Sequence, residues 1–516
     1  MLTEQLFDFL AASPSCYHAV QALAERLERN GYAQLREQDA WALTPGGKYF
    51  VTRNGSSLLS FRIPQSAPAG FLMAAAHTDS PTFKIKHNPE KKSGPYVQLS
   101  TEKYGGMLMG TWFDRPLSVA GRVVTAKDGK LETKLVDVDC DLAVIPSVAI
   151  HMNRAANDGF KLMANVDTLP LYGMQEASGS FRSVVAKAAG VQEDEVLGED
   201  LSLYVRTRGT CLGAKNEFIL APRLDDLGCV FGLLEGFLAA KASGSVPVFC
   251  AFDNEEVGSE TKQGAASSLL SDTLRRIALA LGLNEEGYLR MLAQSFLVSA
   301  DNAHGVHPNH PEYADMTNTP HLNGGVVIKF NANQRYTTDG VSCALFTAVC
   351  REAGAPVQVY ANRSDMPGGS TLGSIATTKV SVPSVDIGLA QLAMHSCVET
   401  AGAEDLDALV KAMTCYYGKT LTRSGEQLTF CVRLKAPSHT GVGADAHIGP
   451  AECTAFYGNL WRIRNFPVGR CGHRPPQGTV QICSCPAGGA GPRLYQPHLI
   501  FCCYIIEKKE ADPSWA

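Results

Sequence analysis

The chain has 516 residues, enough for two or three domains, and its 45% of hydrophobic residues can fill a sizeable core. Its 46 basic and 51 acidic residues give a net charge of −5, without the basic excess of proteins that bind nucleic acids or membrane surfaces. Because no apolar run could span a bilayer and the first residues lack the positive region of a signal peptide, we expect a cytoplasmic protein.

Helix and strand patterns follow one another in the first part of the chain. Residues 1–35 carry apolar side chains at helical spacing, and residues 48–84 alternate as strands do. From about residue 88 to 213, short strand-like stretches are separated by turn residues, and helical patterns are few. This segment is predicted to be a β-rich insertion of the size of a small domain.

From residue 216 onward, strands and helices alternate again, and 405–421 is predicted to be the last helix. The strand-like runs are short and continuously apolar, as in strands that are buried on both faces of a parallel sheet. The sequence therefore predicts an α/β fold with a mixed, mostly parallel sheet and helices on both faces. This domain would be discontinuous, formed by residues 1–87 and 214–427 around the inserted domain 88–213.

The tail, residues 428–516, follows no period and is rich in Cys, Gly and Pro. Cys483 and Cys485 are separated by one residue, whereas zinc fingers place two or more residues between paired ligands. We therefore expect a disordered or non-native extension rather than a metal site. Earlier cysteines such as Cys229 and Cys250 lie in apolar surroundings and are predicted to be reduced core thiols.

Four apolar runs lead to residues of the kinds that bind metal ions. GFLMAAA is followed by His77, VPVFCAF by Asp253, SFLVSA by Asp301, and the segment that begins VSVPSV leads to His395. In open α/β sheets, ligands bind outside the carboxyl ends of the strands. These side chains are therefore predicted to line one edge of the sheet.

Two of these motifs carry further polar groups. In HTDSP, His77 could bind zinc while Asp79 orients it, and the alternative is a loop histidine beside a turn-capping Asp79. In DNEEVGS, Glu255 and Glu256 repel each other unless a cation or a proton intervenes. One of these carboxylates could bind a metal while the other accepts a proton from water. The alternative is a solvated acidic turn.

Three more residues could complete a metal site. Asp225 precedes a strongly helical run and could bridge two ions, although one of Asp225 and Asp226 could instead cap that helix. Asp301 and His395 could supply further ligands. Each residue alone is more often structural, but two histidines with several carboxylates suit Zn, Mn or Co in a two-metal hydrolytic site.

Six motifs in this order resemble those of the aspartyl aminopeptidase family of zinc exopeptidases, above all its bacterial members: HTDSP, PRLDD, FDNEEVGS, SADNAHGVHPN, NRSDMPGGSTLG and QLAMHS. The resemblance covers roughly residues 1–425. It implies a zinc exopeptidase-like fold with a β-rich insertion that is used in assembly, and a homododecamer. It also implies hydrolysis of the first peptide bond of peptide substrates that begin with Asp or Glu.

The resemblance further implies a role for each matching residue. Glu255 would be the general base, Asp79 would stand behind His77, and His151 would stabilise the oxyanion in a neighbouring subunit's site. His304 and Lys329 would recognise the acidic side chain; the alternatives are that His151 is a core histidine and Lys329 a solvated charge. The ligands of two zinc ions, which Mn²⁺ or Co²⁺ could replace, would be His77, Asp225 as the bridge, Glu256, Asp301 and His395.

Other functions are compatible with the same motifs. A related di-metal deacylase or carboxypeptidase would use the same chemistry on another substrate. A catalytically idle assembly or cargo-binding protein could keep the fold, but the intact pair of Glu255 and Glu256 favours an enzyme. A cysteine peptidase is disfavoured because no cysteine lies in a motif with a histidine partner.

Overall fold

The computed structural model describes residues 2–159, 161–241, 243–424 and 427–430. The tail that we predicted to be disordered or non-native therefore lies outside the described residues, apart from 428–430. The helix expected over 405–421 is present but ends at Tyr417, and a short hairpin follows it, formed by β21 (Leu421–Ser424) and β22 (Gln427–Phe430).

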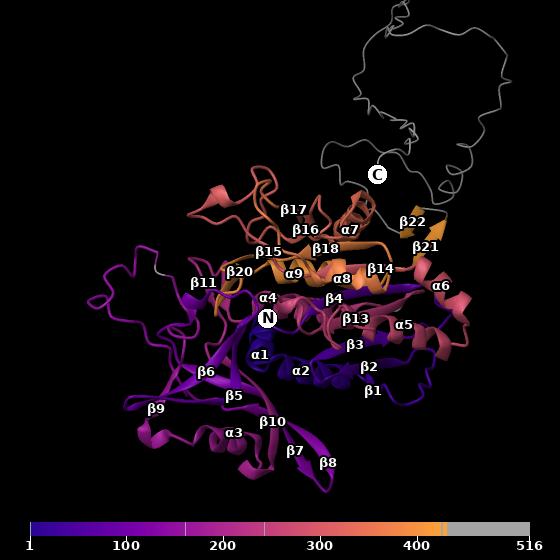
Figure 1. The fold of residues 1–516 in the computed structure, drawn as a ribbon. Helices are drawn as coiled ribbons and strands as arrows, with labels where there is room; N and C mark the ends of the chain where they lie inside the picture. The colour runs from indigo at the N-terminus through magenta and orange to yellow at the C-terminus, as the bar shows by residue number, and fades with distance from the viewer. Residues whose placement is uncertain (1, 160, 242, 425–426, 431–516) are drawn as a thin grey trace, which may run out of the picture. The chain divides into compact units, whose positions relative to one another are not determined.

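A nine-stranded sheet forms the centre of the fold (Figure 1). In spatial order, its strands are β1 (Ala33–Leu35), β2 (Lys48–Arg53), β3 (Ser57–Arg62), β13 (Val246–Phe252), β4 (Phe71–His77), β14 (Phe296–Ala300), β18 (Ser384–Gly388), β16 (Val326–Phe330) and β17 (Val357–Ala361). The four central strands β13, β4, β14 and β18 are mutually parallel, whereas β3 and β16 run antiparallel to their neighbours in this group. The predicted α/β fold with a mixed, mostly parallel sheet is confirmed.

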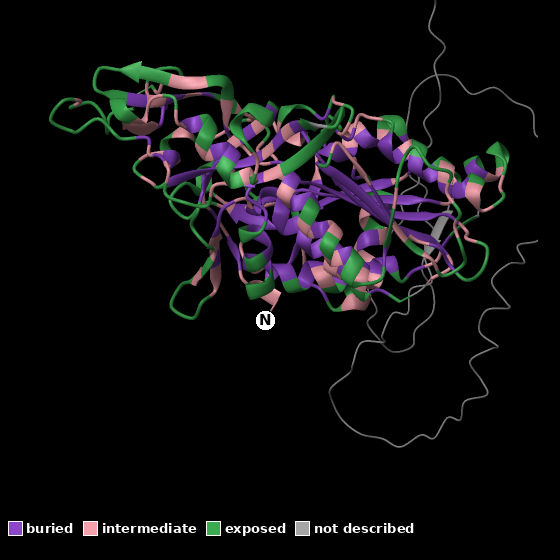
Figure 2. Cartoon of the chain, turned by 90° about the horizontal axis from the view of Figure 1, so that it is seen from below, coloured by how far each residue is buried: buried purple, intermediate pink, exposed green. Residues whose placement is uncertain are grey.

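Two separate layers of apolar side chains cover the two faces of this sheet. Alternate residues of β4 point to opposite faces, so Leu72 and Ala74 belong to one buried cluster and Met73 and Ala75 to the other. This explains why the strand is apolar throughout, without alternation. Figure 2 shows the buried strands between layers whose outer sides are exposed.

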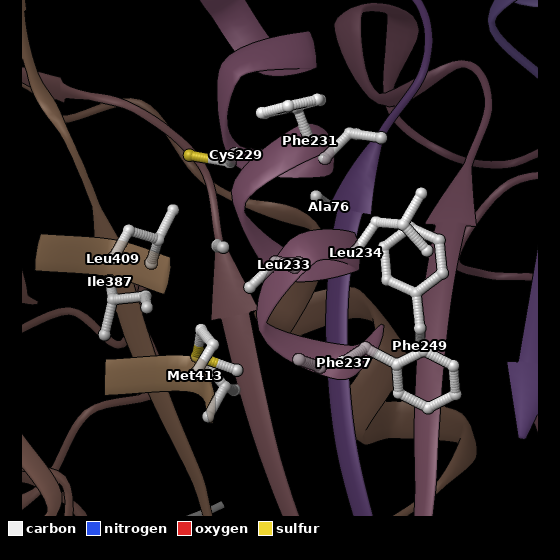
Figure 3. Packing of buried hydrophobic residues seen from close by; sticks show 14 of the residues in the cluster. Ala76, Cys229, Phe231, Leu233, Leu234, Phe237, Phe249, Ile387, Leu409 and Met413 are labelled. Atoms are coloured by element: carbon white, nitrogen blue, oxygen red, sulfur yellow. The ribbon is translucent and has the colours of Figure 1, made fainter. Parts of the chain in front are cut away.

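Helices supply the outer half of each layer. The first face is covered by α1 (Leu2–Ala11), α2 (Cys16–Arg29), α4 (Leu224–Ala239), α7 (Gly340–Ala353) and α9 (Asp405–Tyr417). The second face is covered by α5 (Leu269–Ala280), α6 (Glu285–Ala293) and α8 (Leu372–Lys379). On the first face, α4 is the central helix: Leu233 and Phe237 pack among Phe249 of β13 and Leu409 and Met413 of α9 (Figure 3).

A second sheet of six strands has its own buried cluster, which includes Phe83, Val119 and Leu203 and residues of α3 (Phe181–Ala189). Its strands, in spatial order, are β8 (Lys130–Asp137), β7 (Leu117–Lys127), β10 (Val196–Val205), β5 (Thr82–Ser93), β6 (Tyr96–Tyr104) and β9 (Leu171–Met174). All of them come from the chain between β4 and β12. The division into a discontinuous domain and the insertion 88–213 stays a prediction.

A third sheet, of five strands, pairs segments that are far apart in the sequence. Its strands, in spatial order, are β11 (Thr210–Leu212), β12 (Phe218–Ala221), β20 (Glu399–Gly402), β19 (Ala390–Leu392) and β15 (Ala303–His304). β12 leads into the Asp225 region, and β19 and β20 flank His395. In the part of the chain that is described, no helix is long and apolar enough to cross a membrane, and the cysteines are free thiols.

Candidate metal centre

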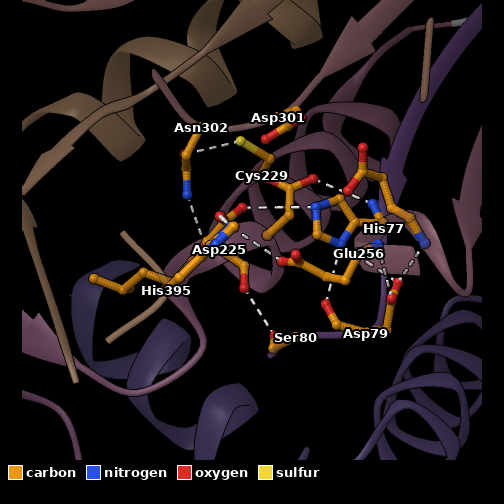
Figure 4. A network of polar contacts seen from close by, with 12 residues as sticks. His77, Asp79, Ser80, Asp225, Cys229, Glu256, Asp301, Asn302 and His395 are labelled. Atoms are coloured by element: carbon orange, nitrogen blue, oxygen red, sulfur yellow. Dashed lines mark hydrogen bonds and ion pairs between the residues drawn. The ribbon is translucent and has the colours of Figure 1, made fainter. Parts of the chain in front are cut away.

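The carboxyl ends of the central parallel strands converge on a cluster of histidines and carboxylates (Figure 4). β4 ends at His77, and Asp301 directly follows β14. The ligand atoms fall into three groups, in each of which they lie within 4.8 Å of one another. The groups are His77 with Asp225, Asp226 and Asp301; His77 with Glu255 and Glu256; and Asp225 with Glu256 and His395.

Asp225 lies between the two histidines. Its Oδ1 is 3.6 Å from His77 Nε2, and its Oδ2 is 3.3 Å from His395 Nε2. His395 Nε2 also lies 3.4 Å from Glu256 Oε1. Because each oxygen of one carboxylate faces a different histidine, Asp225 has the geometry needed to bridge two cations.

Several buried carboxylate oxygens in the cluster make no hydrogen bond. They are Asp225 Oδ1, Asp226 Oδ1 and Glu256 Oε1. A buried acceptor without a partner costs about 1–3 kcal/mol, and more when it is charged. A bound cation would remove this cost, so the donor set fits a metal centre of mixed histidine and carboxylate ligands, as zinc prefers.

The electrostatics also favour a cation. Burial raises the pKa of Glu255 to about 8 and, together with the Asp225 charge, raises the pKa of Glu256 well above its ordinary range. Burial acts in the opposite direction on His77, but the neighbouring carboxylates Asp225 and Asp226 still raise its pKa. The raised pKa values mean that the glutamates and the histidine bind protons more readily than usual. These protons supply positive charge that metal ions would supply instead when bound.

Asp79 connects one histidine to the loop that carries the two glutamates. Its backbone carbonyl contacts His77 Nδ1 at 3.0 Å, and its Oδ1 lies 3.5 Å from the same nitrogen. The backbone N–H of Glu255 donates to Asp79 Oδ1, and that of Glu256 donates to Oδ2. The fully buried contact fixes the orientation of His77, so that its Nε2 points to Asp225.

Glu399, on β20, holds two other members of the cluster. Its Oε2 accepts the backbone N–H of Asp225 at 2.9 Å, and its Oε1 accepts that of His395 at 2.8 Å. The side chain is 2% exposed. One buried carboxylate thus fixes the spacing between the bridging position and the second histidine.

Sequence reasoning missed Asp226 and Glu399. Asp226 lies in the first ligand group, and its Oδ2 accepts the backbone N–H of His77. For Asp226, the signal in the sequence was its place beside Asp225. For Glu399, the signal was an acidic residue inside the apolar stretch just after His395. Conversely, Asp253 follows its strand as expected but is in none of the three ligand groups.

The two residues predicted to recognise an acidic side chain differ in their surroundings. His304 is exposed and lies on the wall of a pocket of about 380 Å³, near Arg363 and Met394. Lys329 is 2% exposed, and its Nζ donates to the carbonyls of Asp301 at 2.8 Å and Asn302 at 3.3 Å. Lys329 is therefore not a solvated charge; it lies behind the Asp301 loop.

His151 is not brought to the cluster within the subunit described. It lies on an exposed turn in the segment 138–170 between β8 and β9, and it is in none of the ligand groups. Five apolar side chains of the same segment are more than two-fifths exposed: Val148, Ile150, Met152, Met163 and Val166. His151 is therefore not a core histidine.

Comparison with known proteins assigns the chain to a family. The sequence model described as aminopeptidase I zinc metalloprotease (M18) matches residues 9–417. The chain is 45% identical over 423 residues to the probable M18 family aminopeptidase 2 of Clostridium acetobutylicum, a match that covers 80% of this chain and 98% of that protein.

Solved structures agree with this comparison. A chain in the cryo-EM structure of the Ape4 and Nbr1 complex matches with a TM-score of 0.78 and 36% identity, over 81% of this chain and 85% of the other. The S. cerevisiae mApe1 dodecamer matches with a TM-score of 0.70 and 28% identity, over 80% of this chain and 95% of the other.

We predict that Glu399→Gln weakens zinc binding by about 10- to 100-fold, the usual effect of changing a residue that orients metal ligands. The new amide would direct an N–H toward the backbone N–H of either Asp225 or His395, where an acceptor is needed. The measurement is calorimetric titration of the chelator-treated protein with zinc. Glu404→Gln, an exposed change near the start of α9, is the control. Equal zinc affinities for the two variants would contradict the role of Glu399.

Proposed function

Because the chain belongs to the M18 family of zinc metalloproteases and is a metalloaminopeptidase, we propose that it removes Asp or Glu from the N-terminus of peptides with the help of two zinc ions. The observation that carries this proposal is the position of Asp225 between His77 and His395, with buried oxygens that lack hydrogen bonds. The cytoplasmic location stays a prediction.

The ligand groups suggest how two ions would be held. His77, Asp225 and Asp301 would hold one ion, and Asp225, Glu256 and His395 the other. Asp225 belongs to both groups and would therefore be the bridge. Asp226 is also a member of the group around His77, and its Oδ2 accepts the backbone N–H of His77. Mn²⁺ or Co²⁺ could occupy the same ligands.

When bound, the zinc ions would act as Lewis acids that lower the pKa of a water molecule and polarise the peptide carbonyl. Glu255 would accept the proton from the attacking water and deliver it to the leaving amine. Its backbone N–H is held by Asp79, so the same residue orients the base and the ligand His77. The carboxylates near the second ion would bind the free α-amine of the substrate, which would restrict cleavage to the first peptide bond.

The preference for Asp or Glu would come from positive charge near the pocket. His304 would meet the substrate carboxylate directly from the pocket wall and donate a ring N–H to it. Desolvation of the ring and the nearby Lys329 charge lower the pKa of His304, so the positive charge itself would come from Lys329. Lys329 would act without touching the substrate, because it is buried. Its Nζ lies 3.9 Å from Asp301 Oδ2 and donates hydrogen bonds to backbone carbonyls. It would position the Asp301 loop and add positive charge to this side of the site.

Self-association would complete the site. The similar mApe1 structure is a dodecamer, and we propose the same closed assembly for this chain. The exposed apolar residues of the segment that carries His151 would be covered by a neighbouring subunit, because exposed apolar surface is costly to leave in water. His151 would then donate a hydrogen bond to the oxyanion in that neighbour's site.

The proposed function predicts release of N-terminal Asp and Glu from short peptides, lost on chelation and restored by zinc, manganese or cobalt. A panel of peptides that begin with Asp, Glu, Leu or Lys, with N-acetyl-Asp as the blocked control, tests it by chromatography of the products. Release of Leu or Lys instead would remove the roles given to His304 and Lys329. Cleavage of acylated amino acids, or of C-terminal residues, would favour the deacylase or carboxypeptidase alternative.

Glu255→Gln should keep zinc and lower kcat by several orders of magnitude, because the amide cannot accept a proton from water. The measurements are steady-state kinetics on the preferred peptide and zinc content by elemental analysis. Turnover within about tenfold of the unchanged chain would show that Glu255 is not the base. Full biological function without turnover would instead support an idle assembly or cargo-binding protein.

Mixed assemblies test whether His151 acts in a neighbouring subunit. His151→Phe alone should keep zinc and lower kcat. In an assembly refolded from equal amounts of the two variants, a His151→Phe subunit keeps Glu255 and can receive His151 from a Glu255→Gln neighbour. Such mixed assemblies should therefore regain part of the activity. No gain over the two separate assemblies would show that His151 does not act across subunits.

A further inference from the structure

The end of β6 lies against the metal centre, although β6 belongs to the six-stranded sheet. The last residue of the strand is Tyr104, and its hydroxyl donates to Asp79 Oδ2 at 2.6 Å. The same hydroxyl accepts a hydrogen bond from Asn254 Nδ2 at 2.8 Å. Tyr104 therefore joins the residue behind His77 to the loop that precedes the two glutamates.

The contact with Asn254 is part of a fixed network. Asn254 Oδ1 accepts hydrogen bonds from Thr261 Oγ1 at 2.8 Å and from Gln263 Nε2 at 2.7 Å, so its amide orientation is determined. Without the Tyr104 hydroxyl, Asp79 Oδ2 would keep only the backbone N–H of Glu256 at 3.2 Å. Asp79 could then turn away from the geometry in which it orients both His77 and Glu255.

The two glycines after Tyr104 contact the second half of the centre. Gly105 has a φ of +75°, and a Cβ at this position would lie 3.1 Å from Glu256 Cβ and 3.3 Å from Glu256 Oε2. The carbonyl of Gly106 accepts a hydrogen bond from His395 Nδ1. Since His395 Nε2 faces Asp225 and Glu256, this bond fixes the tautomer and the direction of the ligating nitrogen.

We propose that Tyr104, Gly105 and Gly106 form a positioning turn, by which the six-stranded sheet holds both halves of the metal centre in catalytic geometry. The proposal rests on the proposed function. Tyr104 acts through Asp79 on the base and on the first histidine, whereas the two glycines act on Glu256 and on the second histidine. The two parts of the turn therefore act on different residues: the tyrosine acts on His77 and on the base Glu255, so its loss lowers turnover even when zinc is in excess, whereas the glycines act on the ligands Glu256 and His395.

The tyrosine is tested with a matched pair of variants on one strand. Tyr104→Phe removes only the hydroxyl and should lower kcat by about 10- to 100-fold with zinc in excess, so that any weaker zinc binding does not limit turnover, and should leave KM unchanged. Tyr96→Phe makes the same change at the exposed start of β6, where the side chain is 47% exposed, and should leave kinetics unchanged. Equal kcat values for the two variants, with both folded as judged by thermal unfolding, would overturn the role of Tyr104.

The glycines are tested without reference to turnover. Gly105→Ala should weaken zinc binding by about 10- to 100-fold in calorimetric titration of the chelator-treated protein. Gly94→Ala, in the turn between β5 and β6, is the control: Gly94 also has a positive φ, +58°, but a Cβ there would meet no atom within 4 Å. Backbone strain is thus common to both variants, and only the contact with Glu256 differs.

The outcomes separate this proposal from the proposed function. If the unchanged chain releases no residue from any peptide, the proposed function fails, but the two zinc titrations still decide whether the turn positions the centre. If Gly105→Ala and Gly94→Ala bind zinc equally well, the turn does not position the metal ligands. If the peptides are cleaved but Tyr104→Phe does not differ from Tyr96→Phe, the positioning proposal fails and the function stands.

Discussion

The burial of several carboxylates beside two histidines is the constraint on which the rest of this structure depends. Water cannot solvate these charges, and the cluster offers few hydrogen-bond donors to replace it. The surrounding structure holds the cluster in place: Asp79 and Glu399 each accept two backbone N–H groups of the centre, and each thereby fixes the position of a proposed ligand or of the proposed base. Divalent cations would neutralise the remaining negative charge of the carboxylates.

The sequence indicated the edge of the sheet at which the cluster of histidines and carboxylates lies, and the reason is the direction of the strands. Continuous apolar runs identified the buried strands β4, β13 and β14, and parallel strands bring their carboxyl ends together. The family was confirmed by comparison, as was the α/β class of the fold. The antiparallel placement of β3 and β16 was not predicted, because pairing partners depend on contacts that no local pattern encodes.

The missed residues Asp226 and Glu399, and also Tyr104, share one physical property: they act through contacts with residues that are distant in the chain. Glu399 reaches the backbone of Asp225, and Tyr104 reaches Asp79 from another sheet. Neither follows an apolar run in the way that His77 or Asp301 does, so periodicity gave no signal. Lys329 was predicted to be a site residue, but its burial against the carbonyls of Asp301 and Asn302 was not. That burial depends on β14 and β16 belonging to the same sheet.

The proposed ligands are distributed from residue 77 to residue 395, over most of the described chain. A growing polypeptide that has not yet passed His395 lacks one histidine ligand and also Glu399, which spaces Asp225 from it. Because metal affinity depends on the whole set being held together, a centre with the complete set of proposed ligands cannot form on such a chain. With the proposed ligand set, peptidase activity would therefore arise only after the chain has been made as far as Glu399 of its 516 residues, and shorter fragments would be inert toward the peptides around them.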